Sequence, residues 1–247
     1  MANGRVLYEG PSQFDGEPIV AVLTGLGRKS DNRKTADMSQ AFILPQRMQD
    51  GRTSSVCGDC MHKPKAEGGA GSCYVNTSQS PATVWRTWKA GGYRPLDLTD
   101  MLTLRRLRTK SMRLGSWGDP AAVPFEVWEP LMAEAPGHTA YTHGWKRCDP
   151  RFKRIAMASC DTGAETLQAL AKGWRPFRVR TGGEPLMPGE FDCPASAESG
   201  HRLTCADCLA CWGADDVATR AFPGITLHGP VNRRRAFLTH FAKKETT

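Results

Sequence analysis

Cysteine spacing constrains this chain more than any other feature of its sequence. Near the C-terminus, Cys205, Cys208 and Cys211 form a CxxCxxC run, and Cys193 precedes it in a Cys-Pro pair. Such a run turns successive sulfurs toward one compact centre, and a Cys from a preceding loop completes a four-sulfur shell. Zinc modules usually pair two CxxC hairpins, so this group favours a [4Fe-4S] cluster, with tetrahedral zinc as the alternative.

A second group, Cys57, Cys60 and Cys73, supplies three thiolates. An incomplete protein shell is what a catalytic metal needs, and the surrounding segment has too few apolar residues to form its own core. The fourth position is open to an exogenous ligand or to one of three residues of the chain: His62, Cys148 and Cys160. Cys148 and Cys160 fit packing or surface roles better.

The class of protein follows from what the sequence lacks. No segment approaches the roughly 18 consecutive apolar residues of a membrane span, and the start has no basic stretch followed by an apolar run. We therefore expect a cytoplasmic protein with no membrane partner. Reducing conditions there keep thiols free, so seven of the nine cysteines are predicted to bind metal rather than to form disulfides.

Short apolar segments alternate with amphipathic ones along the chain. The predicted strands are Pro18–Thr24, Ala41–Leu44, Met112–Ser116, Thr139–Thr142, Arg154–Ser159, Phe177–Arg180 and Ile225–His228. Helices are expected after Ser80, Asp119 and Thr162, each of which fits an N-cap. This rhythm predicts one α/β domain over 1–247, a complete or partial (β/α) barrel, with a doubly wound open sheet as the alternative. The metal-binding loops, 46–80 and 190–215, are expected at the C-terminal ends of the strands.

Polar residues at strand ends are the catalytic candidates, because function gathers there in parallel α/β folds. We single out Asp119, His143 and Arg180; Asp161 and His228 are similarly placed. Asp119 could instead be an N-cap, and either histidine a hydrogen-bonded structural residue. Arg178 and Arg180 share one face of a strand: they form an anion site if that face lines a barrel, and salt bridges if it faces helices.

The positive charge of the chain indicates where anionic partners could bind. The net charge is +8, and Lys and Arg cluster at 25–34, 104–113, 174–180 and 233–235. These clusters are either solvated faces or contacts for nucleic acid or a small anionic substrate. The loop Thr24–Lys29 could cradle a phosphate but lacks a full GxGxxG, which favours an ordinary loop.

Several motifs together support a family resemblance. They are Cys57–Cys60 with Cys73-Tyr74, Trp85-Arg86, the segments 115–120 and 140–143, Cys193–Ser196, and Thr204–Trp212. In these stretches the chain resembles the phage gene-product-88-like proteins. The resemblance implies a phage-associated, cysteine-dependent metal protein of barrel type, acting in the infected host cell, and it supplies no reaction.

We therefore expect a phage-associated protein with one or two [4Fe-4S] clusters that acts as an enzyme on a small anionic substrate at a cluster with an open iron site. The alternative is a basic nucleic-acid-binding protein stapled by zinc or a cluster, and a third possibility is a cluster-bearing regulator of a host partner. The sequence leaves open the number of centres and the oligomeric state.

Overall fold

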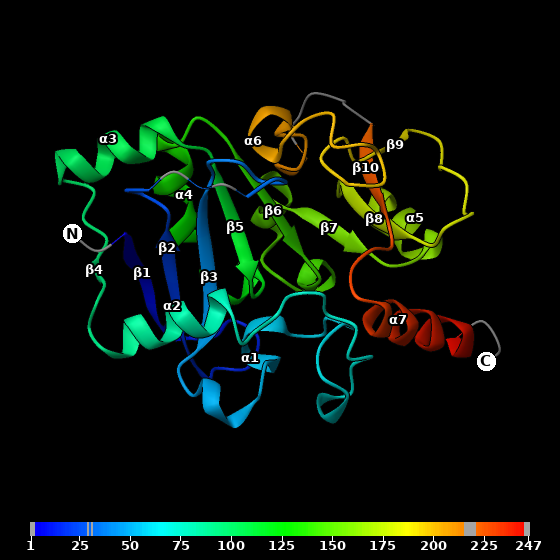
Figure 1. The fold of residues 1–247 in the computed structure, drawn as a ribbon, viewed down its shortest axis with the longest axis horizontal. Helices are drawn as coiled ribbons and strands as arrows, with labels where there is room; N and C mark the ends of the chain where they lie inside the picture. Colours follow the sequence, from blue (N-terminus) through cyan, green and yellow to red (C-terminus); the bar gives the residue numbers. More distant parts are fainter. Residues whose placement is uncertain (1–2, 29, 31, 215–220, 245–247) are drawn as a thin grey trace.

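The computed structural model describes residues 3–28, 30, 32–214 and 221–244 (Figure 1). The strands are β1 Gly4–Pro11, β2 Pro18–Thr24, β3 Ser39–Pro45, β4 Arg94–Pro95, β5 Met112–Trp117, β6 His138–Thr142, β7 Met157–Cys160, β8 Pro176–Arg180, β9 Glu190–Asp192 and β10 Phe222–Thr226. The α-helices are α1 Ser54–Cys57, α2 Ser80–Lys89, α3 Met101–Thr109, α4 Phe125–Glu134, α5 Gly163–Ala171, α6 Cys205–Cys208 and α7 Val231–Lys244.

All of these strands join one sheet, in the order β4-β1-β2-β3-β5-β6-β7-β8-β10-β9. From β3 to β9 every pairing is parallel, whereas β1, β2 and β3 form an antiparallel meander. The protein is therefore a mixed α/β fold with a large, mostly parallel sheet. Its described strands do not close into a barrel, since β4 and β9 stand at opposite ends of the order.

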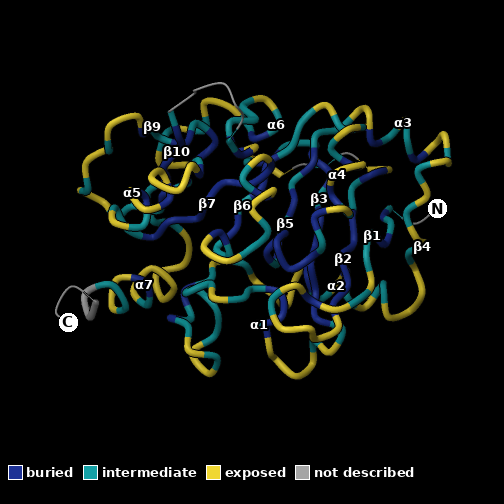
Figure 2. Tube along the Cα trace, turned by 180° about the vertical axis from the view of Figure 1, so that it is seen from behind, coloured by how far each residue is buried: buried dark blue, intermediate teal, exposed yellow. Residues whose placement is uncertain are grey.

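Continuous apolar runs explain the central strands. Each of the seven predicted strands has an observed counterpart, and β2 has the predicted bounds. The β2 residues Ile19 to Leu23 are fully buried, as expected for a strand covered on both faces. Figure 2 shows buried residues concentrated in the strands and exposed ones in the outer loops and helices. β1 was not predicted, because its sequence GRVLYEGP mixes charged residues with Gly and Pro.

Helix starts agree only in part with their predicted caps. Asp119 caps a short 3-10 turn, Pro120–Ala122, and Pro124 separates that turn from α4. Thr162 caps α5 as predicted, accepting a hydrogen bond from the Glu165 amide. Ser80 is the first residue of α2 rather than its cap.

Helices cover the face of the parallel strands that lies away from the two cysteine loops. α5 packs on β7 and β8, and α3 contacts α4. Leu107, Trp128 and Ala169 join these helices to the same core as the strands. No helix in the described part of the chain has the length and apolar character needed to cross a membrane.

Candidate functional site

Strand alternation builds one wall of a cavity of about 210 Å³. Its lining includes Arg113 and Gly115 of β5, Tyr141 of β6, Ser159 of β7, Phe177 and Val179 of β8, and Ile225 of β10. The residues between them, among them Leu114, Ala140 and Ala158, point to the opposite face and are fully buried. We call the first set the pocket face of the sheet.

A bulge at the end of β5 brings more residues to this cavity. Gly115 has a φ of 78°, and the pairing of β3 with β5 shifts register between Gln40 and Phe42. A Cβ at Gly115 would lie 2.6 Å from the Gly118 carbonyl oxygen, so glycine is required there. As a result, Trp117 and Asp119 border the cavity together with Arg113 and Gly115.

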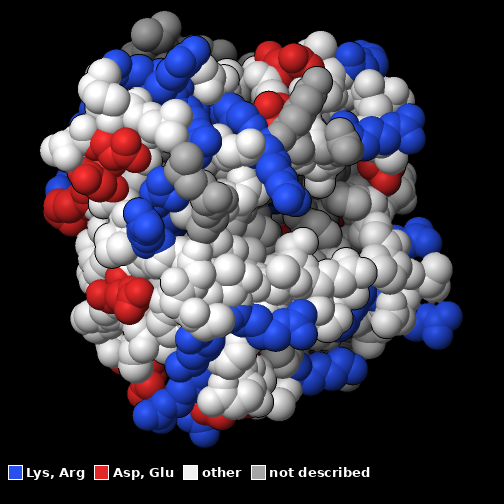
Figure 3. All heavy atoms as spheres, turned by 60° about the vertical axis from the view of Figure 1, so that its left-hand side comes forward, with Lys and Arg blue, Asp and Glu red and all other residues white. Residues whose placement is uncertain are grey.

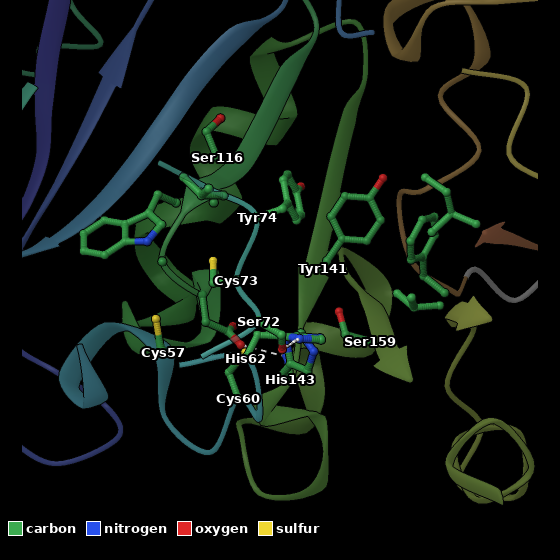
Figure 4. Close-up of a pocket in the computed structure, with 18 of the residues that line it drawn as sticks. Cys57, Cys60, His62, Ser72, Cys73, Tyr74, Ser116, Tyr141, His143 and Ser159 are labelled. Atoms are coloured by element: carbon green, nitrogen blue, oxygen red, sulfur yellow. Dashed lines mark hydrogen bonds between the residues drawn. The ribbon is translucent and has the colours of Figure 1, made fainter. Parts of the chain in front are cut away.

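The three cysteines of the N-terminal group all line this cavity. They come from the loop on one side of it, with Tyr141 and Ser159 on strands across from them (Figure 4). Cys57 ends α1, the Cys60 amide donates to the Cys57 carbonyl oxygen at 2.9 Å, and the Cys73 amide donates to that of His62 at 3.0 Å. The structure therefore brings together the three thiols that the spacing grouped.

A carboxylate anchors the turn that carries Cys57. Glu67 accepts hydrogen bonds from the Thr53 amide at 2.8 Å and from the Ser54 amide at 2.7 Å, and both hydroxyls donate to it as well. Burial raises the pKa of Glu67, but these bonds outweigh burial and lower it. Sequence reasoning missed this residue, because its partners lie thirteen and fourteen positions away in the chain.

Two histidines and an aspartate adjoin the thiols. His62 Nε2 lies 2.9 Å from Asp161 Oδ1, and His143 Nε2 lies 3.4 Å from Asp161 Oδ2. The other nitrogen of His62, Nδ1, lies 2.7 Å from Ser72 Oγ. In the described part of the chain, these three residues are the one group of His, Cys, Asp or Glu whose ligand atoms all lie within 4.8 Å of one another.

Charge in this group is set by burial and by its neighbours. Burial opposes ionisation of Asp161, but His62 and His143 outweigh burial and hold the pKa of this carboxyl far below its usual range. Burial likewise lowers the pKa of His143, and the charges of Cys60 and Asp161 reverse that and raise it well above its usual value. The ionised form of Asp161 and the protonated form of His143 therefore stabilise each other beside Cys60.

Asp119, a predicted catalytic residue, is saturated with hydrogen bonds. Its Oδ1 accepts from the Ala121 amide at 2.9 Å, which is the N-cap role. Its Oδ2 accepts from the Thr142 hydroxyl at 3.0 Å and from the His143 amide at 2.8 Å. Burial outweighs these donors and raises the pKa of Asp119. The carboxylate thus holds the turn that carries His143.

The three residues considered for the fourth position differ in whether they line the cavity. Neither Cys148 nor Cys160 is among the described residues that line the cavity, whereas His62 is. Cys160 lies on the opposite face of β7, fully buried, with its sulfur 3.4 Å from the Ala158 carbonyl oxygen. Cys148 lines a neighbouring cavity of about 910 Å³, which meets the first at His143 and Ser159.

The four C-terminal cysteines also come together. Cys205–Cys208 is one helical turn, closed at its start by a capping box between Thr204 and Asp207. Leu209 then adopts a left-handed φ of 47°, which turns the chain before Cys211. Cys193, Cys205 and Cys211 are each 7% exposed, and the charges of Cys193, Cys205 and Cys208 all act on Cys211.

This second group was expected at the C-terminal ends of the strands, and that expectation is wrong for Cys205–Cys211. Leu209 lies against Gly137, just before β6, and His138 Nε2 contacts the Trp212 carbonyl oxygen at 3.2 Å. Cys211 packs with Met157 and Phe222, the first residues of β7 and β10. Because β10 is parallel to its neighbours, the chain must return to their N-terminal ends before entering it. Residue 215, the end of the predicted loop, lies outside the described residues.

None of the cysteines forms a disulfide in the structure. All nine cysteines are free. Burial raises the pKa of Cys205, with Arg113 and Lys34 opposing it, and burial raises the pKa of Cys211 to about 12 despite a hydrogen bond from Tyr141. Buried, clustered thiols of this kind become thiolates when a metal displaces their protons.

The two arginines of β8 point away from the cavity. Phe177 and Val179 lie on the pocket face, so Arg178 and Arg180 lie on the other. Arg178 Nη2 pairs with Glu190 at 2.8 Å, and Arg180 pairs with Asp192. Of the two roles expected for Arg180, an anion site or a salt bridge, the structure has the salt bridge. His228 does line the cavity, with Nδ1 at 3.1 Å from the Thr226 carbonyl oxygen.

Arg113 is the residue that sequence reasoning overlooked. It borders the cavity, and its Nη2 donates to the Tyr74 hydroxyl at 3.4 Å. It had been grouped with a basic cluster, although its position between the apolar residues Met112 and Leu114 of a strand was a signal that it faces the opposite side. Of the basic loop at 25–34, Lys34 also lines the cavity, and Lys29 lies outside the described residues.

Comparisons with known proteins add no assignment. No family model matches this chain, and no curated protein or solved structure is significantly similar to it. Function must therefore be argued from the site itself.

Proposed function

We propose that this protein is a phage-associated iron–sulfur enzyme with two metal centres. Cys193, Cys205, Cys208 and Cys211 hold a structural or electron-transferring [4Fe-4S] cluster. Cys57, Cys60 and Cys73 hold a second centre, whose remaining coordination position faces the cavity and a small anionic substrate. One observation carries the proposal: three thiols, with no fourth cysteine beside them among the described residues, open onto one cavity.

The cysteine pattern of the C-terminal group favours iron over zinc. Four thiolates around one tetrahedral zinc, at about 2.3 Å each, lie about 3.8 Å from one another. Among the described residues, no three cysteine sulfurs lie within 4.8 Å of one another. A cluster has a larger core than a single ion and holds its sulfurs further apart. The described cysteines are thus not arranged as a compact zinc shell, and the preference for iron rests on the CxxCxxC run with its remote Cys193.

The proposed centre at Cys57, Cys60 and Cys73 has one coordination position that no cysteine fills. His62 is the chain's own candidate for it, but both of its ring nitrogens lie within hydrogen-bond distance of other groups, Ser72 and Asp161. This leaves the position for an exogenous ligand. A cluster held by Cys57, Cys60 and Cys73 would supply an iron without a protein ligand, which would polarise a substrate oxygen or supply an electron.

The chain's own residues then supply proton handling and charge. His143 can hold a proton at Nε2 beside Asp161 and deliver it into the cavity that it lines. Asp119 keeps that histidine in place through its backbone amide. Among the described lining residues the cations are Lys34, Arg113 and Arg233, and the only carboxylate is the saturated Asp119. This balance favours an anionic substrate.

The test is anaerobic purification with analysis of iron, sulfide and zinc. We expect a brown protein that contains iron and sulfide. Cys208→Ser should lose the colour of the four-thiolate cluster, whereas Cys57→Ser should retain it and lose only the iron of the second centre. Cys148→Ser, outside both groups, is the matched control and should bind as much iron as the natural chain. A colourless protein that contains zinc refutes the proposal.

Nucleic-acid binding is the second candidate, favoured by the exposed arginines of α3 and α7. Arg105 and Arg108 are exposed on α3, and Arg233–Arg235 on α7. On the face shown in Figure 3, however, Lys and Arg are interspersed with acidic and uncharged side chains rather than gathered into one stripe. Binding to nucleic acid that weakens steeply with salt, and that falls on charge reversal in α7, would favour this function.

A further inference from the structure

Arg113 is a cation placed in the cavity wall without an anionic partner. Its Nε is fully buried and has no hydrogen-bond partner, and the Tyr74 hydroxyl is the one partner of its guanidinium in the described part of the chain. No described carboxylate lies within ion-pair distance of it. The guanidinium carbon lies 5.7 Å from the ring centre of Tyr141, which adds a weak cation–π contact.

A guanidinium with buried N–H groups destabilises the fold unless hydrogen-bond acceptors or a counter-ion pair with it. A guanidinium has five N–H donors and stays charged at any physiological pH, and burying it without a counter-ion is unfavourable. Arg178 in this same protein shows the ordinary solution, a buried arginine bonded to two carboxylates, those of Glu184 and Glu190. Arg113 has a buried Nε without a partner and no carboxylate among the described residues, so the guanidinium is free to pair with an anion from outside the chain.

The size and walls of the cavity define that partner. A cavity of roughly 150 Å³ holds a benzene molecule. At about 210 Å³, the cavity here fits a ligand slightly larger than benzene. Apart from its cations, thiols and histidines, the cavity is mainly apolar, with Tyr141 and Phe177 packed edge to face at 4.8 Å. Val179, Ile225 and Leu227 extend the apolar wall.

The structure assigns Arg113 as the anchor for a small organic acid: the guanidinium binds the carboxylate, and the apolar body of the ligand lies against the pocket face. Two parallel N–H donors of a guanidinium match the two oxygens of a carboxylate. Tyr74, which receives the bond from Arg113, is the chain neighbour of Cys73. A ligand held at Arg113 therefore extends alongside the three thiols. This assignment deepens the proposed function and rests on it for the reaction, but not for binding.

A competing role for Arg113 is to balance the charge of the four-thiolate centre. Cys205 is one of its electrostatic neighbours, together with Tyr74 and Tyr141. In that role, removal of the arginine would lower the iron content and leave carboxylate binding either absent or unchanged. The two roles therefore predict different measurements on the same variant.

The experiment measures binding of acetate, butyrate and benzoate to the full-length, anaerobically purified protein by calorimetry, with benzamide as the neutral analogue of benzoate. We expect at least one carboxylate to bind and benzamide to bind far more weakly. Arg113→Gln should weaken carboxylate binding about 10- to 100-fold at unchanged iron content, and Arg113→Lys by less. Arg108→Gln, a surface arginine paired with Glu134, is the matched control and should bind normally.

Each other result overturns the assignment. The assignment fails if no carboxylate binds, if inorganic phosphate binds in place of all three, or if benzamide equals benzoate. It also fails if Arg113→Gln binds carboxylate normally or loses iron in parallel with binding. A colourless protein that still binds benzoate through Arg113 would refute the metal centres and leave this assignment standing. Because benzoate and benzamide are compared on the natural chain, a variant that does not fold leaves the test valid.

Discussion

Replacing Glu67 by Gln should loosen the turn that carries Cys57. The carboxylate accepts bonds from two amides and two hydroxyls, those of Thr53 and Ser54. A Gln side chain keeps one acceptor oxygen and turns the other position into a donor, which then faces donors. About half of the bonds are therefore lost, and the Ser54 amide or the Thr53 amide is left without a partner.

The magnitude follows from those bonds. Hydrogen bonds to a charged acceptor contribute about 1.5–3 kcal/mol each, and the partial exposure of this carboxylate places them at the lower end. Allowing for water that replaces some of them, we expect a loss of about 2 kcal/mol in the free energy of unfolding. For a chain of 150 to 250 residues, that corresponds to a fall of about 4–8 °C in Tm.

Circular dichroism melts of the metal-free protein measure this change. A second readout is the rate at which a thiol reagent labels Cys57, resolved by peptide mass spectrometry; it should rise in Glu67→Gln. The matched control is Glu126→Gln, whose exposed side chain pairs with Arg151 and should change stability by less than about 0.5 kcal/mol. Equal melts and equal Cys57 labelling in the two variants would refute the anchoring role of Glu67.

The pH dependence has a definite sign. The folded protein lowers the pKa of Glu67 below its usual value. The stabilisation is therefore fully present above the unfolded pKa of about 4.3 and is lost as pH falls through the lower folded value. The difference in Tm between the natural chain and Glu67→Gln should be constant near neutral pH and shrink in acid. A difference that grows in acid would contradict the assignment of this carboxylate as the ionised acceptor.

Three further predictions concern the cysteine groups and the packing around them. In metal titrations of the refolded protein, Cys208→Ser should bind about half the iron of Cys148→Ser, because it leaves the other group intact. Arg178→Met should lower the free energy of unfolding by about 3–5 kcal/mol, measured by urea denaturation, since it leaves Glu190 buried and unpaired; a Glu190→Leu partner substitution should restore most of it. Phe237→Ala should cost about 3 kcal/mol and detach α7, seen as faster proteolysis before residue 231, because this buried ring stacks on His62 at 5.6 Å.

Secondary structure was predictable where local pattern decides it. The run Pro18–Thr24 is almost entirely apolar, which favours a buried strand, and Thr162 with Glu165 marked the start of α5. α7 was not predicted, because its three successive arginines indicate a solvated charge cluster, and the ring that fixes the helix, Phe237, packs on residues distant in the chain. The antiparallel pairing of β1, β2 and β3 likewise depends on contacts between strands, which a local sequence pattern does not predict.

The candidate site shows the same division. Spacing alone grouped the cysteines, since each group is built on CxxC pairs whose thiols share a turn. The sequence could not predict which face of β8 borders the cavity. Phe177 and Arg178 lie on opposite faces in any case, and only the position of the cysteine loops decides which of them faces the cavity. Arg113 was hidden for the same reason, because its significance depends on the absence of a described carboxylate around it, which is a property of packing rather than of sequence.

The contacts of the two cysteine groups bear on whether they could converge on one centre. Several charged groups shift the pKa values of Cys57 and Cys73, and the thiols among them all belong to the N-terminal group. Likewise, the thiols that shift the pKa values of Cys193, Cys205 and Cys211 all belong to the C-terminal group. Cys205 neighbours Arg113 near the start of β5, whereas the Val56 carbonyl oxygen, next to Cys57, accepts from the Asp119 amide beyond its end. Ligands of one cluster must all reach the same compact core, so these contacts support the proposal of two centres rather than one.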